Sequence, residues 1–210
     1  MAIATTSDYK TYAGISSSTY DTRLGVLITA AQSMMEEYCG RLFDSSSYED
    51  FIDGCGSAVL IVKNPPIAAI TYIRVYAFPG DTNYTTLDSD YYTYDATSGV
   101  IKITPSRGAR FFRDTFNETI GPNFGQWPNF TVGFQNVHVK YDGGYTSGTM
   151  PAGLKLALYK IVDALFAQTR ADMSLSSETL GSYSYSRGGA QAFDDTVKVL
   201  LKPWTRRENL

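Results

Sequence analysis

The residues that could do chemistry are few, and their spacing fits no catalytic or metal site. His138 is the single histidine of the 210-residue chain, so any serine or cysteine nucleophile would need it as its base. It lies in an alternating segment with no motif around it, which indicates a structural or surface role. Cys39 and Cys55 lack CxxC spacing, and with one histidine they do not supply the ligands of a zinc site. We therefore expect no enzyme activity, no metal and no cofactor.

Carboxylates among tyrosines are the other chemical pattern. Residues 88–95, DSDYYTYD, hold three aspartates and three tyrosines. Paired carboxylates can cleave glycosides and aromatic rings stack on sugars, but the same composition also describes an acidic β-hairpin. The spacing of Asp88 and Asp90 lacks the glycine and the terminal glutamate of a calcium loop. A carbohydrate-binding module and a glycan-cleaving enzyme stay open as alternatives, although nothing selects a catalytic pair.

Basic residues alternate with aromatic ones in residues 107–113, RGARFFR. Such a segment can hold single-stranded nucleic acid, or it can form the hot spot of a protein interface. The chain has 18 basic and 21 acidic residues, a net charge of −3, which disfavours a general phosphate-binding protein. We therefore predict a subunit interface here, formed by Arg107, Arg110, Phe111, Phe112 and Arg113. Residues 44–99 carry eight acidic residues against two basic ones, so opposed patches could pair head to tail between copies.

The C-terminal residues, KPWTRRENL, combine a tryptophan with three basic side chains. A frayed terminus is one interpretation. The other is a docking peptide in which the indole fills a pocket while the cations pair with acids on a partner. The candidate docking residues are Lys202, Trp204, Arg206 and Arg207.

Two long helices frame the sequence. Apolar residues at helical spacing predict a helix over residues 21–40, and Gly40 is placed to end it. A second helix over residues 152–172 follows Pro151, and a shorter one covers residues 192–201. The second helix is apolar on two sides, so we expect Leu156, Tyr159 and Phe166 to face a neighbouring subunit. Residues 1–18 read as a lead-in with one weak turn near residues 9–13.

Between the long helices the apolar residues alternate with polar ones, the two-residue period of a β-strand. Strands are predicted over residues 48–52, 58–62, 69–78, 90–94, 100–104 and 137–141. Asp53 and Gly54 are expected to turn the first strand into the second, and residues 96–99 to close a hairpin. Residues 105–135 show no regular spacing of apolar residues, so we predict a long excursion of the chain between strands.

The predicted fold is α+β, a small bundle of three main helices with a large antiparallel β-rich insertion between the first and second helices. Residues 1–46 would hold the N-terminal segment and first helix, 47–146 the β-rich lobe, 147–202 the remaining helices and 203–210 the tail. A signal-peptide pattern and an apolar run of membrane-spanning length are both lacking, so we expect no membrane partner.

Several segments in order resemble the head-to-tail connector (adaptor) proteins of tailed bacteriophages. AAQSMMEEYCGRLF (residues 30–43) is similar to the family's alanine-rich helix, and NPPIAAITYIRVY (residues 64–76) to its proline-led strand. VKYDGGYTSGTMPAGLKLAL (residues 139–158) resembles its strand, glycine turn and proline-led helix, and GSYSYS (residues 181–186) its short strand. Residues 80–135 are longer than in a minimal family member.

The resemblance implies a structural virion protein that forms a ring, typically twelvefold, beneath the portal protein. Such a ring extends the DNA channel, which DNA crosses without sequence-specific contact, and gives a platform for a neck stopper or tail-completion protein. The C-terminal segment would reach the portal through Trp204, Arg206 and Arg207, with Lys202 beside them. The protein would act at the head–tail junction of the virion after assembly in the host cytoplasm.

Overall fold

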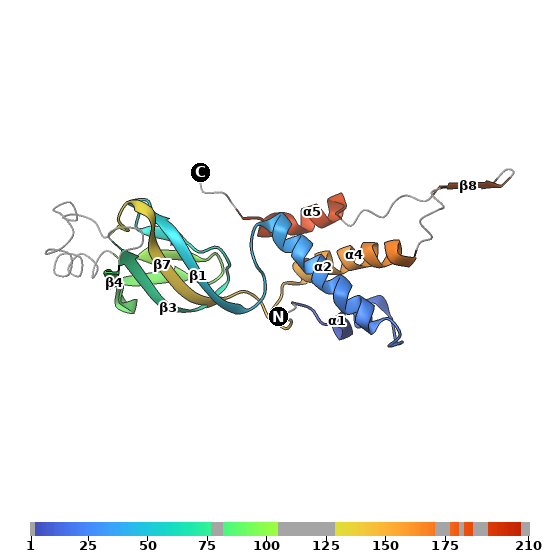
Figure 1. Cartoon of the computed structure of the whole chain (residues 1–210), viewed down its shortest axis with the longest axis horizontal. Coiled ribbons are helices and arrows are strands. Elements are labelled where there is room, and N and C mark those ends of the chain that lie inside the picture. Colours follow the sequence, from blue (N-terminus) through green and yellow to red (C-terminus); the bar gives the residue numbers. More distant parts are fainter. Residues whose placement is uncertain are drawn as a thin grey trace. The chain divides into compact units, whose positions relative to one another are not determined.

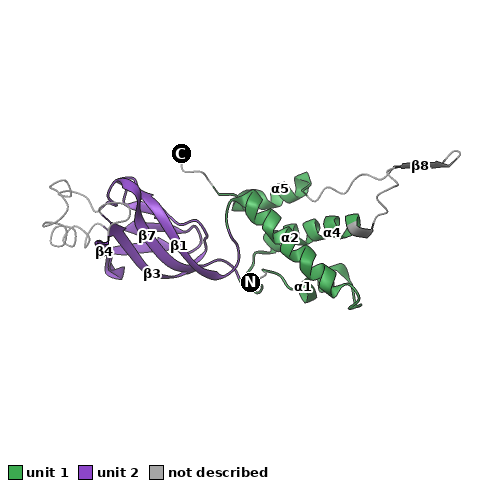
Figure 2. Ribbon diagram, in the orientation of Figure 1, with its two compact units in different colours: residues 1–41, 146–210 green, residues 42–145 purple. Residues whose placement is uncertain are grey.

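The chain folds into two compact units, each described here by itself (Figures 1 and 2). The computed structural model describes residues 3–76, 82–104, 129–170, 177–180, 183–186 and 193–206. The helical unit comprises Met1–Arg41 and Thr146–Leu210, and the β unit is the continuous stretch Leu42–Tyr145. The class is therefore α+β, as the sequence predicts, and its two sheets in the β unit are antiparallel.

The helical unit holds four α-helices in its described part: α1 (Thr6–Ala13), α2 (Asp21–Cys39), α4 (Ala152–Arg170) and α5 (Asp195–Leu201). A single 3-10 turn, η2 (Lys202–Trp204), follows α5. The buried residues of α2 recur at helical spacing, as predicted, and are Leu24, Ile28, Ala31, Met35 and Cys39. Gly40 ends the helix in the left-handed conformation at φ 66°. Both long helices are confirmed.

The prediction of one weak turn near residues 9–13 was wrong, because α1 forms there. Thr5 caps it: the Thr5 hydroxyl accepts from the amide of Asp8 at 3.1 Å, and the Asp8 carboxylate accepts from the amide of Thr5 at 3.0 Å. This reciprocal capping box satisfies two backbone donors that would otherwise have no partner. The signal was present in the sequence as a threonine three residues before an aspartate.

The β unit contains two sheets. The larger has the order β1-β7-β3-β4, from β1 (Ser46–Gly54), β7 (Gly133–Gly143), β3 (Ile67–Tyr76) and β4 (Tyr84–Thr86). The smaller has the order β2-β6-β5, from β2 (Val59–Ile61), β6 (Val100–Ile103) and β5 (Tyr92–Asp95), with the 3-10 turn η1 (Ser89–Tyr91) before β5. In the C-terminal part, β8 (Ser177–Leu180) and β9 (Tyr183–Ser186) form a separate two-stranded hairpin.

Strand pairing confirms one predicted turn and corrects another. Residues 96–99 close the hairpin of β5 and β6, as expected. Asp53 and Gly54 do not turn β1 into β2, because β1 pairs with β7 and β2 pairs with β6. The Asp53 carboxylate instead accepts from the amide of Gln135 at 2.7 Å, and the Gly54 amide donates to Asn136 at 2.8 Å. These two residues therefore anchor β1 to the start of β7.

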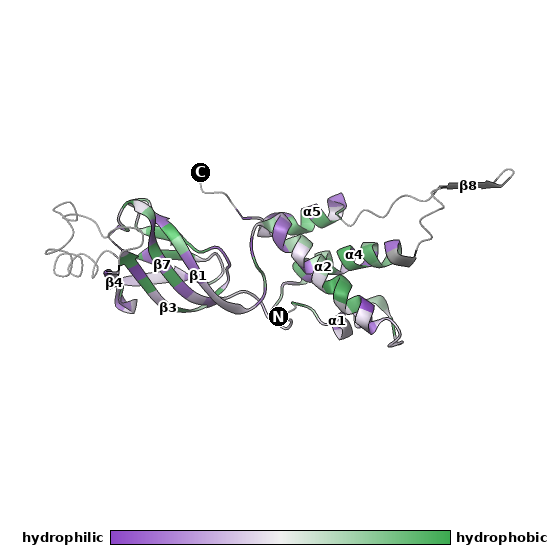
Figure 3. Ribbon diagram, viewed as in Figure 1, coloured by the Kyte–Doolittle hydropathy of each residue, from purple (hydrophilic) through white to green (hydrophobic). Residues whose placement is uncertain are grey.

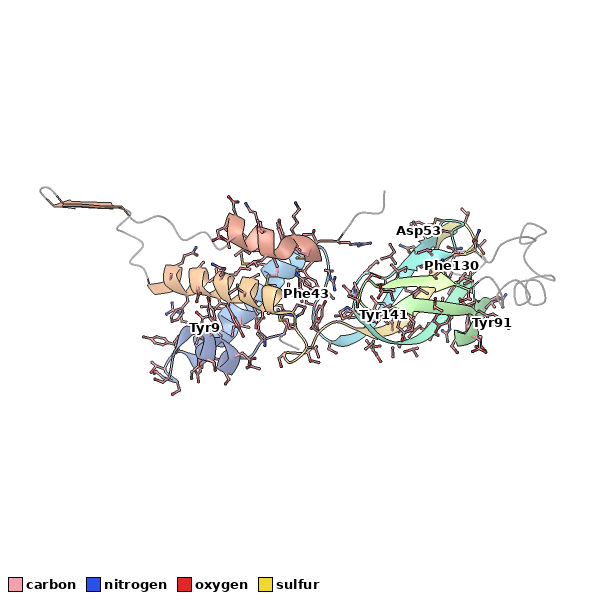
Figure 4. All side chains as sticks on the ribbon, turned by 180° about the vertical axis from the view of Figure 1, so that it is seen from behind. Tyr9, Phe43, Asp53, Tyr91, Phe130 and Tyr141 are labelled. Carbon is pink, nitrogen blue, oxygen red and sulfur yellow. The ribbon has the colours of Figure 1, made fainter. Side chains whose placement is uncertain are left out.

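The core of the β unit lies between its two sheets. The inward residues of the larger sheet pack against those of the smaller one in a single cluster, which includes Ile73, Val75, Val137, Val139, Tyr141, Leu60, Ile101 and Ile103. Figure 3 shows hydrophobic and hydrophilic residues alternating along the strands. Tyr141, labelled in Figure 4, donates from its hydroxyl to the buried Asp50 carboxylate at 2.9 Å. The amide of Asn64 donates to the same hydroxyl at 3.0 Å, so this buried polar group is paired.

Candidate interaction surfaces

Strand alternation places a row of aromatic and charged residues on the outer face of the larger sheet. Val137 and Val139 point into the core, so His138 and Lys140 of β7 lie on the opposite face, as the alternation predicts. His138 is paired in register with Phe51 of β1 and with Arg74 of β3. Cross-strand neighbours on one face contact each other directly, so this register brings side chains of three strands together, and the pairing of Tyr76 with Tyr84 adds β4.

Six of these residues form a continuous aromatic ladder: Phe51, His138, Tyr72, Arg74, Tyr84 and Tyr76. The Phe51 and His138 rings are stacked, with centroids 4.1 Å apart and planes 15° apart. His138 meets Tyr72 edge-on at 5.2 Å. The ladder runs from β1 to β4, and the Phe51 ring at its β1 end is 48% exposed.

Arg74 is the cation at the centre of the aromatic ladder. Its guanidinium carbon lies 3.9 Å from the centroid of the Tyr72 ring and 4.3 Å from that of Tyr84. Tyr84 in turn contacts Tyr76 at 5.5 Å. Each contact of an arginine with an aromatic face is worth about 0.5–1 kcal/mol at exposed sites. Two rings therefore hold the guanidinium in place before any partner binds.

The surroundings of His138 lower its pKa. Burial is the largest cause that lowers its pKa, and Arg74 also lowers it, while Glu49 acts in the opposite direction. The His138 Nε2 lies 3.5 Å from a carboxylate oxygen of Glu49 and makes no hydrogen bond. Glu49 is engaged by Lys140, whose ammonium lies 2.7 Å from its other oxygen, and the hydrogen bond from Lys140 is the largest cause that lowers the Glu49 pKa.

The surroundings of His138 suit packing better than proton transfer. Phe51 stacks on one face of the ring, Tyr72 meets it edge-on, and the nearest carboxylate, that of Glu49, lies at the long distance of 3.5 Å and is bound to Lys140. Among the described residues, no group of three or more His, Cys, Asp and Glu side chains is arranged to hold a metal ion. None of the helices in the described ranges is long and apolar enough to span a bilayer.

The three helical residues predicted to face a neighbouring subunit lie in different environments. Tyr159 is 6% exposed and packs against Tyr9 and Tyr12 of α1, with centroids 5.8 and 4.8 Å away. Phe166 is 8% exposed and meets Tyr20 at 5.6 Å. Leu156 is 37% exposed. The chain's own N-terminal segment therefore covers two of the three, and only Leu156 is exposed enough to contact a neighbouring subunit.

The C-terminal segment returns to the end of α2. Lys202 and Trp204 form η2, and the backbone amide of Arg206 donates to the carbonyl oxygen of Cys39 at 2.8 Å. A helix leaves its last carbonyl groups without intrahelical partners, so this bond satisfies one of them. Arg207 lies outside the described residues.

The arginine–phenylalanine segment predicted as an interface also lies outside the described ranges, with Arg107, Arg110, Phe111, Phe112 and Arg113. Sequence reasoning missed the aromatic ladder, which the structure does describe. The available signal was the alternation of Tyr72, Arg74 and Tyr76 on the polar side of a predicted strand.

Comparisons with known proteins agree with one another on a class of virion protein. The chain is similar in structure to one in the neck of an empty gene transfer agent particle computed with C6 symmetry, at 14% identity and a TM-score of 0.56, covering 98% of this chain and 90% of that one. A chain in the neck of the native particle, computed with C12 symmetry, matches at 13% identity and a TM-score of 0.51, over 90% of this chain and 85% of that one.

A chain of the native virion matches at 13% identity and a TM-score of 0.52, over 92% of this chain and 82% of that one. At these identities the likeness shows the fold. No curated protein matches the sequence. The family model described as head completion protein matches residues 2–118, which is more than half of the chain. The chain therefore belongs to the head completion protein family.

Proposed function

We propose that the chain is a structural subunit of the neck of a phage-like particle, where it forms a ring beneath the portal. The observation that carries the proposal is the fold likeness to a neck chain over nearly the whole length of both chains, together with the family match. Symmetries C6 and C12 in the two related necks support a closed ring, for which twelve copies is the expected number. The ring would work in the virion after assembly in the host cytoplasm.

The neck role needs binding surfaces and no catalytic step. The ring would continue the DNA channel, touch DNA without reading its sequence, and give a platform for a neck stopper or tail-completion protein. The net charge of −3 suits a channel lining that does not bind phosphate tightly. The family and its structural neighbours do not favour the carbohydrate-binding alternative.

We place portal docking in the C-terminal segment, at Lys202, Trp204, Arg206 and Arg207. The bond from Arg206 to Cys39 supports this assignment, because it fixes where the last residues leave the helical unit. A tethered tail loses less entropy on docking than a free one. In the ring subunit the helices would act as a bundle that carries the β unit as an insertion. Arg107, Arg110, Phe111, Phe112, Arg113 and Leu156 stay candidates for contacts between copies, whereas Tyr159 and Phe166 would support such contacts from beneath.

The test is to locate the chain in intact particles. Antibody-gold labelling should place it at the head–tail junction, and cryo-electron microscopy of the same particles should show this fold in a ring directly below the portal. Label on the distal tail or fibres would overturn the proposal. Label at the junction in a ring that does not touch the portal would keep the neck role and overturn the adaptor position.

A further inference from the structure

The aromatic ladder has the composition of a protein-binding hot spot. Tyrosine and arginine are enriched at such spots, and a ring held by its neighbours loses little conformational freedom when a partner binds. Phe51 and Tyr84, on the two outermost strands of the sheet, are each about half exposed. The ladder is therefore an ordered surface, still open at both ends in the single chain.

The aromatic ladder contains a cation, Arg74, that has no acidic partner among the described residues. In the part of the chain that the structure describes, its guanidinium has no carboxylate within ion-pair distance, and the carboxylate of Glu49 on the same sheet is bound to Lys140. The Arg74 Nε is also buried without a hydrogen-bond partner. A buried donor that lacks an acceptor costs about 1–3 kcal/mol, so a carboxylate brought to this position would gain a strong charge-assisted bond.

Carboxylates in excess are found elsewhere on the same unit. The described residues of the β unit carry eight acidic side chains against four basic ones. Copies brought side by side in a ring would repel each other unless an acidic surface of one met a cation of the next. Residues 88–95 form an acidic stretch in which Asp88, Asp90 and Asp95 are all exposed and no residue is basic.

Hydrogen bonds also hold part of the acidic segment in a fixed position. The Asp95 carboxylate is fixed by the amide of Thr97 at 3.0 Å and the hydroxyl of Ser98 at 2.6 Å, and these bonds lower its pKa, so it stays charged. Strand β5, which ends at Asp95, is the edge strand of the smaller sheet, and that sheet shares a core with the inner face of the larger one. One β unit thus presents an aromatic face with Arg74 at its centre and, on the sheet across its core, an acidic tyrosine-bearing edge.

We propose that the aromatic ladder of one copy binds the acidic segment, residues 88–95, of the next copy, with Arg74 as its carboxylate-binding residue. The contact is heterologous, joining different surfaces of identical chains, and such contacts close into rings. The proposal rests on the proposed ring and adds to it the two surfaces that meet.

Photo-crosslinking in assembled particles tests the contact directly. A benzophenone amino acid replaces Phe51, which lies on the outer face of the larger sheet. Strand β5 of the same chain belongs to the sheet on the other side of the core, so a crosslink from Phe51 to residues 88–95 must join two copies. We expect irradiated particles to yield an adduct of twice the chain mass, with the crosslink mapped by mass spectrometry to residues 88–95. Crosslinks to another segment of the chain, to a different virion protein or to DNA would overturn the proposal, as would a lack of adducts.

Charge exchange provides the second test. Arg74→Glu alone, and Asp88→Arg with Asp90→Arg and Asp95→Arg alone, should each reduce the yield of finished particles in a complementation assay by at least tenfold. All four substitutions in one chain should restore most of the yield, because every interface in the ring then has its charges reversed together. Failure of the combined variant to recover while it remains folded by circular dichroism would overturn the pairing.

A matched control separates this contact from general charge effects. Lys63→Glu makes the same change of charge at an exposed position between β2 and β3, outside both the aromatic ladder and the acidic segment, and should leave the yield unchanged. The two proposals also fail differently. If the wild-type chain is missing from purified particles, the neck role fails; if it is present but Phe51 crosslinks elsewhere, the inference about the two surfaces alone fails.

Discussion

The backbone amide of Arg206 donates to the carbonyl oxygen of Cys39 at 2.8 Å, which ties the C-terminal segment to the last turn of α2. The bond uses the main chain of Arg206, so its side chain stays available for a partner. It also means that removing the tail does two things at once: it deletes candidate docking side chains and it frees a helix carbonyl. Binding experiments need to separate these effects.

Replacing side chains in the tail should weaken portal binding without unfolding the chain. We expect Trp204→Ala combined with Arg206→Ala and Arg207→Ala to abolish binding to purified portal, measured by biolayer interferometry, while circular dichroism shows that the variant is folded. Truncation after Pro203 should abolish binding and lower the free energy of unfolding by about 0.5–1.5 kcal/mol more than the triple variant does, the worth of one hydrogen bond. Lys198→Ala, an exposed cation of α5, is the matched control. Full binding by the triple variant would contradict the docking assignment.

The Tyr9 hydroxyl should stabilise the helical unit measurably. It donates to the Asp163 carboxylate at 2.6 Å, whereas Tyr12 reaches the same carboxylate at 3.3 Å from a more exposed position. Tyr9→Phe should therefore cost about 1.5–3 kcal/mol in urea unfolding, as expected for a bond to a charged group, and Tyr12→Phe distinctly less. Equal costs for the two variants would show that the short bond has no special role.

The same bond predicts how stability changes at high pH. Burial is the first cause that raises the pKa of Tyr9, followed by the bond to Asp163. A folded pKa above the unfolded one gives stability that is fully present below the unfolded value, about 10, and is lost as the pH rises above it. Between pH 9 and 11 the wild type should lose more stability than Tyr9→Phe does.

His138 should make the protein less stable as the solution becomes mildly acidic. Its pKa is lowered in the folded chain, chiefly by burial, so the unfolded chain binds the proton first. Stability is therefore present above the ordinary histidine pKa of about 6.5 and declines as the pH falls below it. Urea unfolding at pH 7.5 and 5.5 should show this decline in the wild type and a smaller one in His138→Gln. Glu49 should add little to this decline, because the hydrogen bond from Lys140 lowers its pKa. Equal declines in the two proteins would show that groups other than His138 cause the effect.

Gly144 should be intolerant of any side chain. Its φ is +87°, and an added Cβ would collide with the backbone carbonyl of Asp44. Gly144→Ala should lower the free energy of unfolding by about 1–3 kcal/mol or more, because it adds a steric clash to backbone strain. Gly148→Ala, four residues away, would bring its Cβ only into ordinary contact with the Thr146 hydroxyl at 4.0 Å, and should change the free energy of unfolding by less than about 0.5 kcal/mol. A tolerated Gly144→Ala would show that this turn adjusts easily.

Local patterns in the sequence predicted much of the fold. The stripe of α2 and its glycine end, the proline-led α4 and the hairpin of β5 and β6 all depend on residues close together in the chain. Pairing between distant strands was not predictable in this way. Asp53 and Gly54 have the composition of a turn, yet tertiary contacts with β7, about eighty residues later, use them as an anchor.

The same contrast between local patterns and long-range pairing applies to the candidate surfaces. The alternation around His138 was visible, and with it the residue's lack of a catalytic setting. The aromatic ladder was not, because it depends on the register that sets Phe51 and Arg74 beside the same histidine. Tyr159 and Phe166 show the reverse error: a second apolar side of α4 suggested a partner, but the N-terminal segment of the same chain covers it.

The two ends of the β unit are fastened to each other. The amide of Ser45 donates to the carbonyl of Tyr145 at 3.0 Å, and the amide of Tyr145 donates to the carbonyl of Phe43 at 2.7 Å. The chain thus enters and leaves the unit through one closed junction, so the unit's length adds little to the entropy of closing it. A β unit of different sequence could therefore be grafted between these two points without changing the helices, provided that its own ends meet in the same way.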